Sequence, residues 1–431
     1  MSFPRYPAYR DSEDPMIGQV PKHWTKTALK RLANYQNGYP FKPEDWGDSG
    51  RPIIRIAQLT GGAEPDRYAG IVDERVAVYE GDLLFSWSAT LDSFFWQGEP
   101  AWLNQHIFKV TPSTESTNGF LYFLIKFWAP KLADVDAHGS TMRHIKKESL
   151  GQRLFVPPID EQRSISAFLD RETAKIDALV AEQEKLIALL QEKRQAVISH
   201  AVTKGLNPNV HLKDSGVEWL GEVPFHWSVK AIKWLSPVLR GASPRPIEDP
   251  KYFDDDGEYA WVRIADSTAS TGMLTETTQR LSALGSSLSV KLEIGQLFVS
   301  IAGTVGKPCI TAIKACIHDG FVYFPRLQIN PKFLFRIFEA GVCYGGLGKM
   351  GTQLNLNTDT IGSIRIAVPP PEEMTEVLSF IDRETAKLDT LMTEARTAIT
   401  LLQERRTALI SAAVTGQIDV RGLVGGVNTP D

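Results

Sequence analysis

Residues 156–205, VPPIDEQRSISAFLDRETAKIDALVAEQEKLIALLQEKRQAVISHAVTKG, decide the fold because the chain contains them twice. Residues 368–417, VPPPEEMTEVLSFIDRETAKLDTLMTEARTAITLLQERRTALISAAVTGQ, align with them without a gap. Roughly half of about 50 positions are identical, which shared helical composition alone would not produce. A shorter pair, IGQVPKHW at 17–24 and LGEVPFHW at 220–227, opens each half. The chain is therefore organised as variable block, helix block, variable block, helix block.

Both helix blocks predict a long amphipathic helix, because apolar residues recur at steps of four and three after a Pro-Pro dipeptide. Each helix would span about 40 residues, or roughly 60 Å at about 1.5 Å per residue. The expected seam comprises Ile165, Leu169, Ile176, Leu179, Leu186, Leu190 and Val197 in the first copy, and Val377, Ile381, Leu388, Leu391, Ala398, Leu402 and Leu409 in the second.

The charges of these helices favour antiparallel pairing. One antiparallel register brings Glu172 near Arg405 and Lys193 near Glu384, whereas a parallel pair would place like charges side by side. Exposed ion pairs contribute only about 0–1 kcal/mol each, so this preference is weak. The alternative is that the two helices are unrelated and that these charges belong to solvated faces.

The variable blocks alternate short apolar runs with Gly and Pro, which predicts a mixed α/β domain in each. Strands are expected at 52–56, 83–87 and 107–110 in the first block, and at 260–264, 297–301 and 321–324 in the second. A helix is expected after each set, at 119–128 and at 331–338. Residues 203–216 contain two glycines and a proline and are expected to form a turn and linker.

The predicted fold class is therefore mixed α/β, with two globular α/β domains separated by two long helices. The helices are expected to pack as an antiparallel coiled coil with pseudo-two-fold symmetry. The expected boundaries are a first globular domain at 1–158, a central helical spacer and linker at 159–215, a second globular domain at 216–370, and a C-terminal helical spacer at 371–425.

Composition narrows the class of protein. The chain has 431 residues, of which 43% are hydrophobic and 23% charged, with a formal net charge of −4, so a disordered or collagen-like chain is excluded. No apolar run approaches the roughly 20 residues of a membrane helix. The N-terminus lacks the pattern of a secretory signal. Three cysteines without metal-binding spacing suit a reducing compartment, so a cytoplasmic location is expected.

The usual motifs of catalysis are missing. SIAGTVGK at 300–307 lacks the first glycine and the final Ser/Thr of a phosphate-binding loop, and no glycine-rich cofactor turn follows a strand. The eight histidines show no metal-ligand spacing, so we predict no metal site and no catalytic residue. His23 and His226 each precede a Trp in the repeated motif and are expected to pack or cap rather than to catalyse.

FLDRETAKIDALVAEQEKLIALLQEKRQAVISHAVTKG at 168–205, followed by HLKDSGVEWLGEVPFHW at 211–227, resembles the specificity (S) subunit of type I restriction–modification systems. The order of two variable and two helix blocks extends this resemblance over essentially the whole chain. The resemblance implies that the variable blocks are target recognition domains, each reading one half of a bipartite, asymmetric sequence in double-stranded DNA. An adaptor that holds two protein ligands is the alternative function.

The resemblance also implies partners and a division of labour. The chain itself would have no catalytic activity and no cofactor. Two modification (methyltransferase) subunits would bind the helices, and the chain would direct the adenine-N6 methylation that they carry out with their own S-adenosylmethionine. Restriction subunits that use ATP and Mg would cleave unmodified DNA.

Candidate DNA contacts are polar residues on loops that strands position, because Arg, Lys, Asn and Gln read base edges best. In the first block these are Arg55, Gln58, Ser86, Ser88, Thr90, Ser140, Thr141, Arg143 and His144, with Lys146 and Lys147 as phosphate contacts. In the second block they are Arg263, Asp266, Ser267, Thr304, Lys307, Lys349, Thr352, Gln353 and Asn355, with Arg240 and Arg245 as phosphate contacts. For each charged residue alone, a plain solvated surface role is about as probable, and Trp87 and Trp96 are expected in the core.

Candidate partner contacts are polar residues that recur on the helix blocks, since a surface kept in both copies could serve two identical partners. They are Glu182, Lys185, Gln191 and Arg194 in the first copy and Glu394, Gln403 and Arg406 in the second. The alternative is that both copies merely preserve the pairing of the two helices.

Overall fold

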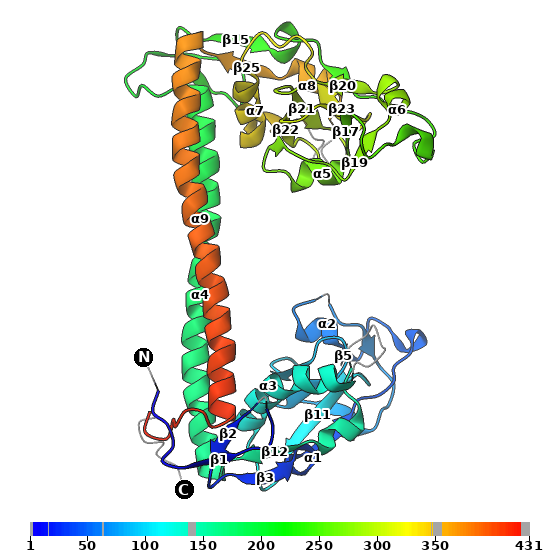
Figure 1. Cartoon of the computed structure of the whole chain (residues 1–431), viewed down its shortest axis with the longest axis vertical. Coiled ribbons are helices and arrows are strands. Elements are labelled where there is room, and N and C mark those ends of the chain that lie inside the picture. Colours follow the sequence, from blue (N-terminus) through cyan, green and yellow to red (C-terminus); the bar gives the residue numbers. More distant parts are fainter. Residues whose placement is uncertain are drawn as a thin grey trace. The chain divides into compact units, whose positions relative to one another are not determined.

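The structure of the chain is a computed structural model, which describes residues 3–15, 17–62, 64–136, 144–345, 347 and 356–423. The chain divides into two compact units, residues 1–183 with 397–431 (unit 1) and residues 184–396 (unit 2). Each unit contains one variable block together with the adjoining parts of the two long helices, α4 (Ile159–Lys204) and α9 (Pro371–Val414). Each unit is a mixed α/β body (Figure 1).

Unit 1 is built from short strands and a longer helix that covers one of its sheets. Its described strands form two four-stranded sheets, ordered β6-β5-β10-β7 and β4-β11-β8-β9, and the pairs β1-β2 and β12-β3. The elements are β1 (Tyr9–Asp11), β2 (Gln19–Pro21), β3 (Thr25–Ala28), α1 (Leu29–Leu32), β4 (Ala33–Asn37), η1 (Pro43–Asp45), β5 (Arg51–Ile54), α2 (Ile56–Leu59), β6 (Arg67–Tyr68), η2 (Glu74–Val76), β7 (Ala77–Val78), β8 (Leu83–Ser86), β9 (Asp92–Phe95), β10 (Ala101–Leu103), β11 (Ile107–Pro112), α3 (Asn118–Asp136), η3 (Lys147–Gly151) and β12 (Arg153–Val156).

Unit 2 repeats this plan with one more strand in a sheet. Its described strands form a five-stranded sheet, β16-β24-β21-β22-β18, a four-stranded sheet, β19-β17-β23-β20, and the pairs β13-β14 and β15-β25. The elements are β13 (Leu212–Asp214), β14 (Glu222–Pro224), β15 (Ser228–Ala231), η4 (Ile232–Trp234), β16 (Leu239–Arg240), η5 (Pro250–Tyr252), β17 (Tyr259–Val262), α5 (Ile264–Ala269), β18 (Met273–Leu274), β19 (Gln279–Leu281), α6 (Ala283–Ser287), β20 (Val290–Leu292), β21 (Leu297–Ser300), β22 (Pro308–Thr311), β23 (Ala315–Ile317), β24 (Phe321–Tyr323), α7 (Pro331–Ala340), η6 (Val342–Tyr344), α8 (Thr358–Ser363) and β25 (Arg365–Val368).

The expected strands and helices of the variable blocks are present. The predicted strands correspond to β5, β8 and β11 in unit 1 and to β17, β21 and β24 in unit 2, and the predicted helices correspond to α3 and α7. One segment differs from its prediction: the expected linker 203–216 contains β13, which pairs antiparallel with β14. This hairpin corresponds to the β1-β2 hairpin of unit 1. The second α/β block therefore begins before residue 216, the boundary predicted from the glycines and proline of the expected linker.

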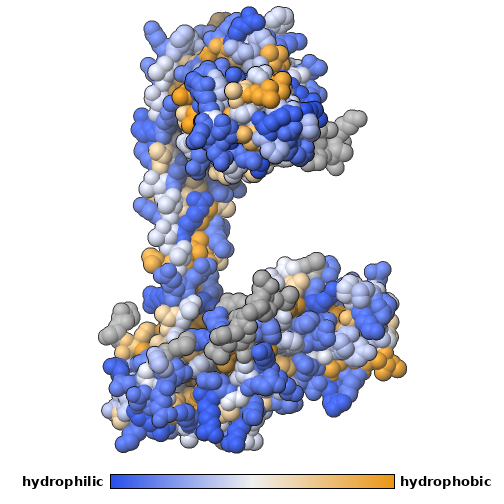
Figure 2. Space-filling model, turned by 45° about the vertical axis from the view of Figure 1, so that its right-hand side comes forward, coloured by the Kyte–Doolittle hydropathy of each residue, from blue (hydrophilic) through white to orange (hydrophobic). Residues whose placement is uncertain are grey.

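In each unit the long helices and the α/β block share a hydrophobic core. In unit 1, Phe120 of α3 belongs to the same buried cluster as Ile165 of α4 and Leu409 of α9. In unit 2, Phe333 of α7 clusters with Ile198 of α4 and with α9. Burying one such side chain contributes roughly 1.5–3 kcal/mol, so each block is firmly joined to its own part of the helix pair. The face of the molecule in view in Figure 2 is mostly hydrophilic, with apolar side chains in small groups.

Part of the contact between the two long helices is shifted by one residue from the predicted seam. Leu179, Leu186 and Leu391 are 45%, 41% and 47% exposed, so they lie outside the contact between the helices. The buried or half-buried positions, which recur at steps of four and three, are Leu169, Thr173, Ile176, Val180, Gln183, Ile187 and Leu190 in α4, and Ile381, Thr385, Leu388, Met392, Ala395, Ile399 and Leu402 in α9. Each misassigned leucine is followed by another apolar residue, so periodicity alone left two choices and packing selected the second.

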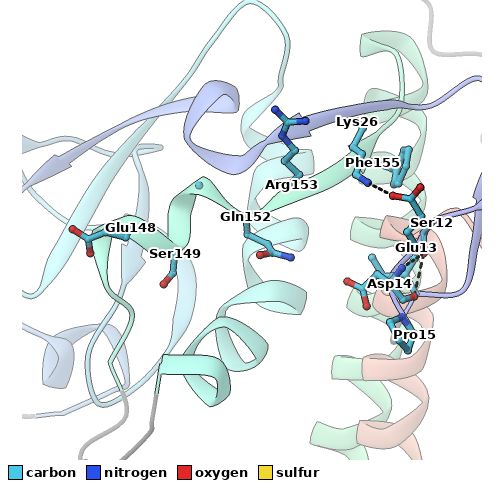
Figure 3. A pocket seen from close by; sticks show the side chains of 12 residues that line it. Ser12, Glu13, Asp14, Pro15, Lys26, Glu148, Ser149, Gln152, Arg153 and Phe155 are labelled. Carbon is cyan, nitrogen blue, oxygen red and sulfur yellow. Dashed lines mark hydrogen bonds and ion pairs between the residues drawn. The ribbon is translucent and has the colours of Figure 1, made fainter.

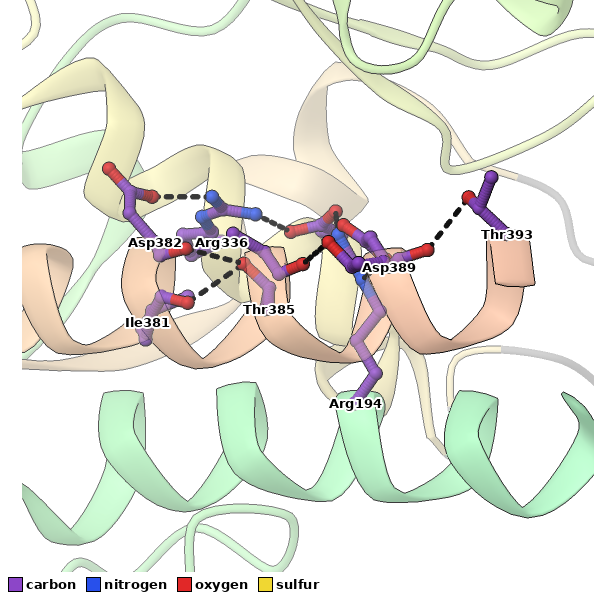
Figure 4. A network of polar contacts seen from close by, with 10 residues as sticks. Arg194, Arg336, Ile381, Asp382, Thr385, Asp389 and Thr393 are labelled. Atoms are coloured by element: carbon purple, nitrogen blue, oxygen red, sulfur yellow. Dashed lines mark hydrogen bonds and ion pairs between the residues drawn. The ribbon is translucent and has the colours of Figure 1, made fainter. Parts of the chain in front are cut away.

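Ion pairs between the helices occur at equivalent repeat positions in the two units. In unit 2, Arg194 Nε lies 2.9 Å from Asp389 Oδ1 (Figure 4). In unit 1, Arg406 Nε lies 3.0 Å from Asp177 Oδ1. In unit 1 the first half of α4 contacts the end of α9, and in unit 2 the end of α4 contacts the start of α9, so the helices run antiparallel within each unit.

Glu172 and Glu384 pair with lysines of their own helices instead of with the predicted residues of the opposite helix. Each carboxylate lies 2.9 Å from a lysine three residues ahead on its own helix, Lys175 and Lys387 respectively. These pairs lower the pKa of both carboxyls. The short reach of an intrahelical pair at this spacing explains why these glutamates do not follow the predicted interhelical register.

Candidate nucleic-acid interface

A buried glutamate joins the first α/β block to the start of its long helix. Glu161, in the first turn of α4, accepts hydrogen bonds from Tyr6 Oη at 2.5 Å and Trp24 Nε1 at 2.8 Å. Its second oxygen lies 2.8 Å from His23 Nε2. Glu161 is only 5% exposed, so its charge is balanced by these donors and by its position at a helix N-terminus. We call these four residues the unit 1 joint.

Unit 2 contains the same arrangement. Glu373, in the first turn of α9, lies 2.9 Å from Trp227 Nε1 and 2.7 Å from His226 Nε2. These three residues form the unit 2 joint. The expectation that both histidines pack or cap is confirmed by their contacts, which join each α/β block to the start of a long helix. The two glutamates were missed as candidates, although both helix repeats place an acidic residue at this position.

Two predicted contact residues meet at the same place in each unit, where a strand ends and a short helix begins. In unit 1 the Arg55 backbone N–H donates to Gln58 Oε1 at 3.0 Å. In unit 2 the Arg263 backbone N–H donates to Asp266 Oδ2 at 2.9 Å. The first turn of a helix leaves backbone N–H groups without partners, and these side chains satisfy one of them. The two units therefore share a scaffold that carries an amide in one and a carboxylate in the other.

The two arginine side chains differ in freedom. Arg55 forms an ion pair with Asp66, and its guanidinium lies 4.4 Å from the ring centroid of Trp46. Its side chain is 30% exposed. Arg263 is exposed and hydrogen-bonds to the side chain of Gln279. An approaching DNA duplex would meet the Arg263 side chain directly. Arg55 would meet it either while still paired with Asp66 or after giving up that ion pair.

In unit 2 the second predicted segment packs beside the first. Thr268 Oγ1, near the end of α5, donates to Thr304 Oγ1 at 2.9 Å. Lys307 Nζ donates to the carbonyl oxygens of Thr268 and Ser270, at 2.5 and 2.8 Å. Lys307 thus caps the C-terminal end of α5, and its ammonium is engaged by the protein rather than directed to a phosphate.

Glycine is required where this loop crosses α5. Gly303 has φ +64°, and a Cβ built there would lie 2.8 Å from Ile264 Cγ2. A larger residue would have to adopt a left-handed conformation and displace the first residue of the helix. The close crossing is what brings Thr304 onto the surface that carries Arg263 and Asp266.

In unit 1 the corresponding loop runs beside the chain that follows α3. The Ile145 backbone N–H donates to the Trp87 carbonyl at 2.9 Å, and Ser88 and His144 form an isolated antiparallel bridge. Thr90 is half-buried, and Lys146 and Lys147 are exposed at the start of η3. The structure therefore brings together two segments that the sequence nominated separately. The predicted contacts that lie outside the described residues are Ser140, Thr141, Arg143, Lys349, Thr352, Gln353 and Asn355.

Three predicted contacts are buried, which argues against their touching DNA. Ser86, Ser88 and Ser267 are 0%, 8% and 1% exposed. Ser86 is the last residue of β8, and its hydroxyl donates to the Ser88 carbonyl at 3.3 Å. The strand predicted at 83–87 ends at Ser86, and Ser88, expected on the loop after it, forms an isolated bridge with His144. Trp87 is half-buried, with its ring 5.9 Å from that of Phe108, as a core role requires.

The two predicted phosphate contacts of unit 2 converge on one acidic residue. Arg245 lies 3.3 Å from Asp319 Oδ2, and Arg240 Nε donates to the Asp319 carbonyl. Arg245 remains 78% exposed, so its guanidinium is available to a second anion. Beside them, burial lowers the pKa of His318 below its ordinary value of 6.5, more than the neighbouring Asp319 raises it.

This histidine makes the stability of unit 2 dependent on pH. Because the folded pKa of His318 lies below the unfolded one, the unfolded chain binds the proton first as the pH falls. The stability that unit 2 gains from a neutral His318 is fully present above about pH 6.5. It is lost as the pH falls through the pKa of this histidine in the folded state. Urea unfolding is measured at pH 7.5 and 5.5, about one unit on either side of the ordinary histidine pKa. Between these two pH values, the free energy of unfolding should fall further for the natural chain than for His318→Asn. Equal losses in the two proteins would contradict the assignment.

Two of the predicted partner contacts are engaged within the chain. Arg194 bridges Asp389 and Glu339, and Arg406 pairs with Asp177, with side chains 23% and 29% exposed. Both arginines pair with the opposite long helix, which favours the alternative that these repeat positions preserve the pairing of the two helices. The remaining predicted contacts, which are all exposed, are Glu182, Lys185, Gln191, Glu394 and Gln403.

Two further searches of the described residues bear on function. Among them, no group of three or more His, Cys, Asp or Glu side chains is arranged to hold a metal ion. No helix in the described part of the chain has the length and apolar character needed to cross a membrane.

Comparison with known proteins shows what this chain is similar to. Residues 21–188 match the model described as type I restriction modification DNA specificity domain. The type I restriction enzyme EcoBI specificity subunit of Escherichia coli is 31% identical over 186 residues, which cover 42% of this chain and 39% of that relative. The EcoDI specificity subunit of the same organism is 21% identical over 323 residues, which cover 69% and 70% of the two chains. The first alignment thus spans about two-fifths of its relative's length.

Solved structures show the same fold. One, described as showing complex assembly and conformational transition of the type I R-M system, has a TM-score of 0.71 and 14% identity, covering 92% of this chain and 98% of that chain. The HsdS subunit from Thermoanaerobacter tengcongensis has a TM-score of 0.51 and 14% identity, with 93% and 98% covered. The predicted mixed α/β fold is thereby confirmed. The resemblance read from the repeats is confirmed as well: residues 21–188 match the model of the type I restriction modification DNA specificity domain, and both of these relatives are type I specificity subunits.

Proposed function

We propose that this chain is the specificity subunit of a type I restriction–modification complex and that each unit reads one half of a bipartite DNA target. The observation that carries the proposal is the shared reading scaffold. Equivalent turns present Arg55 and Gln58 in unit 1 but Arg263 and Asp266 in unit 2. An amide can both donate and accept, whereas a carboxylate only accepts, so the same position would favour different bases. The two half-sites should therefore differ.

The proposed role of the helices is to space the two readers. We infer that α4 and α9 form an antiparallel coiled coil with pseudo-two-fold symmetry, supported by the equivalent ion pairs Asp177–Arg406 and Arg194–Asp389. Such a spacer would match the half-sites of a target split by a fixed number of base pairs. Recurring exposed residues of the helices, Glu182 and Glu394 among them, would then face two identical partners.

The proposed division of labour leaves the chemistry to other subunits. Two modification subunits would supply S-adenosylmethionine and methylate adenine N6, and restriction subunits with ATP and Mg would cleave unmodified DNA. The chain would contribute recognition and assembly, without a catalytic group. A cytoplasmic location would follow from this role.

Methylome sequencing of cells that express this chain with its modification partner tests the proposal. We expect one split, asymmetric motif with N6-methyladenine in each half. Replacing residues 216–370 with the second variable block of another specificity subunit should change one half of the motif and leave the other half unchanged. A loss of both halves, with the chain still folded, would contradict independent reading by the two units.

A symmetric motif, or methylation without sequence preference, would also contradict the proposal. The alternative, an adaptor that holds two protein ligands, predicts no DNA footprint and no dependence of DNA affinity on salt. Footprinting of the purified complex distinguishes the two functions.

A further inference from the structure

Each unit has a corner at which an antiparallel strand pair turns into a short helix. In unit 1, β3 pairs with β12 so that Ala28 faces Arg153, and the Leu29 N–H donates to the Gln152 carbonyl at 3.1 Å. In unit 2, β15 pairs with β25 so that Ala231 faces Arg365, and the equivalent hydrogen bond, Ile232 N–H to the Ile364 carbonyl, is 2.9 Å long. The two corners thus share the same strand pairing and the same hydrogen bond at the start of the short helix.

Both corners present exposed cations at corresponding positions. Unit 1 has Lys30 after the strand and Arg153 opposite it, and unit 2 has Lys233 and Arg365 at the same places. The next position differs, with Arg31 in unit 1 and Trp234 in unit 2. Lys230 adds a further cation to the second corner. We call these residues the basic corners, and among the described residues none of their cations forms an ion pair with a carboxylate.

The unit 2 corner surrounds two adjoining hollows. One, of about 580 Å³, is lined by Lys230, Lys233, Trp234 and Arg365, and the other, of about 600 Å³, shares Lys233. Of the described residues that line them, Asp359 is the single carboxylate. Trp234 is 70% exposed, with the Lys233 ammonium 5.8 Å from its ring centroid. An exposed indole can donate its N–H to an anion while its ring lies against an apolar surface.

The unit 1 corner borders a hollow of about 670 Å³ that Arg153 shares with Glu13, Asp14 and Lys26. Lys26 is paired with Glu13 at 2.9 Å. In Figure 3 the Arg153 side chain extends away from this pair. Arg153 is therefore free to meet an anion that approaches from outside the hollow.

We propose that the two basic corners are contact sites for DNA phosphates, separate from the loops that read bases. The inference rests on the proposed function and adds a second surface to it. The base-reading turns differ between the units, as two unlike half-sites require, but both corners share one lysine (Lys30 and Lys233) and one arginine (Arg153 and Arg365). A feature kept in both units suits a ligand group that is the same in both half-sites, and the phosphate backbone is such a group.

The test is the salt dependence of DNA affinity in the complex of the full chain with its modification partner. Equilibrium binding is measured between about 50 and about 200 mM salt, on a duplex with the methylome motif and on a scrambled duplex of equal length. Replacing two phosphate contacts, Lys233→Ala with Arg365→Ala, should reduce the slope of log K against log salt by about 1.8. The reduction should be equal on both duplexes, and Lys30→Ala with Arg153→Ala should give the same result.

Matched controls keep the outcome clear. Lys291→Ala removes an exposed lysine of β20 that lines neither hollow of the corner and should leave the slope unchanged. Trp234→Ala should weaken binding severalfold without a change in slope, because an indole carries no charge. All substituted residues are exposed, so circular dichroism spectra should match that of the natural chain.

Two results would overturn the proposal. An unchanged slope in both corner variants would show that no phosphate is bound there. Loss of assembly with the modification partner, at an unchanged slope for the complex that does form, would show that the corners bind an acidic protein surface instead. Failure of the proposed function would be seen separately, because the natural complex would then bind the motif duplex and the scrambled duplex equally. The slope of the corner variants would still report whether the corners bind phosphates.

Discussion

Replacing Glu161 by alanine is expected to lower the free energy of unfolding of unit 1 by about 3 kcal/mol. The carboxylate accepts hydrogen bonds from Tyr6 and Trp24, and Trp24 is 1% exposed. Each buried donor that loses its acceptor costs roughly 1–3 kcal/mol. His23 would lose its partner as well, but it is 40% exposed at the side chain and can bind water.

Glu373→Ala is the internal comparison for this prediction. Glu373 is 26% exposed, and its described hydrogen-bond partners are two rather than three, so its loss should cost less, about 1–2 kcal/mol. Asp160→Ala is the control, since its side chain is 94% exposed and surface substitutions usually change stability by less than about 0.5 kcal/mol. Hydrogen exchange of the full chain in increasing urea, read on peptides of each unit, gives the three values. Equal effects for Glu161 and Asp160 would contradict the joint.

Replacing Leu388 by alanine is expected to cost about 3 kcal/mol, because it opens a cavity in the contact between the helices. Leu388 is 7% exposed and clusters with Leu190 and Met392. Leu391, one turn further along the same helix, is 47% exposed and should lose less than about 1 kcal/mol on the same substitution. The two leucines are chemically identical, so the comparison reports burial alone.

The same comparison can be made at the equivalent positions of unit 1. Ile176 is 5% exposed and Leu179 is 45% exposed. Ile176→Ala should therefore be costly and Leu179→Ala mild, as measured by urea unfolding of the full chain. If both members of either pair proved costly, the seam would pass between the two positions, and the phase assigned here would be wrong.

The polar loops show where sequence reasoning stopped. Arg55 and Gln58 were found because they follow an apolar strand, and the structure does bring them together. Ser86 was chosen by the same logic but is buried, because it is the last residue of β8 rather than part of the loop that follows the strand. Lys307 was chosen for its charge, yet its ammonium is held by two carbonyl oxygens of α5. Residue type could not distinguish a cation that meets a ligand from one that caps a helix.

The sequence by itself determined the duplication, the two long helices, the strands of each α/β block and the resemblance to type I specificity subunits. These depend on local periodicity and on identity between two stretches of one chain, both of which are legible without coordinates. Only the tertiary structure decided the phase of the helix seam, the glutamate joints and the burial of the serines. Each of these depends on contacts between residues far apart in the chain, such as Trp24 with Glu161, and such contacts are set by packing that no local pattern encodes.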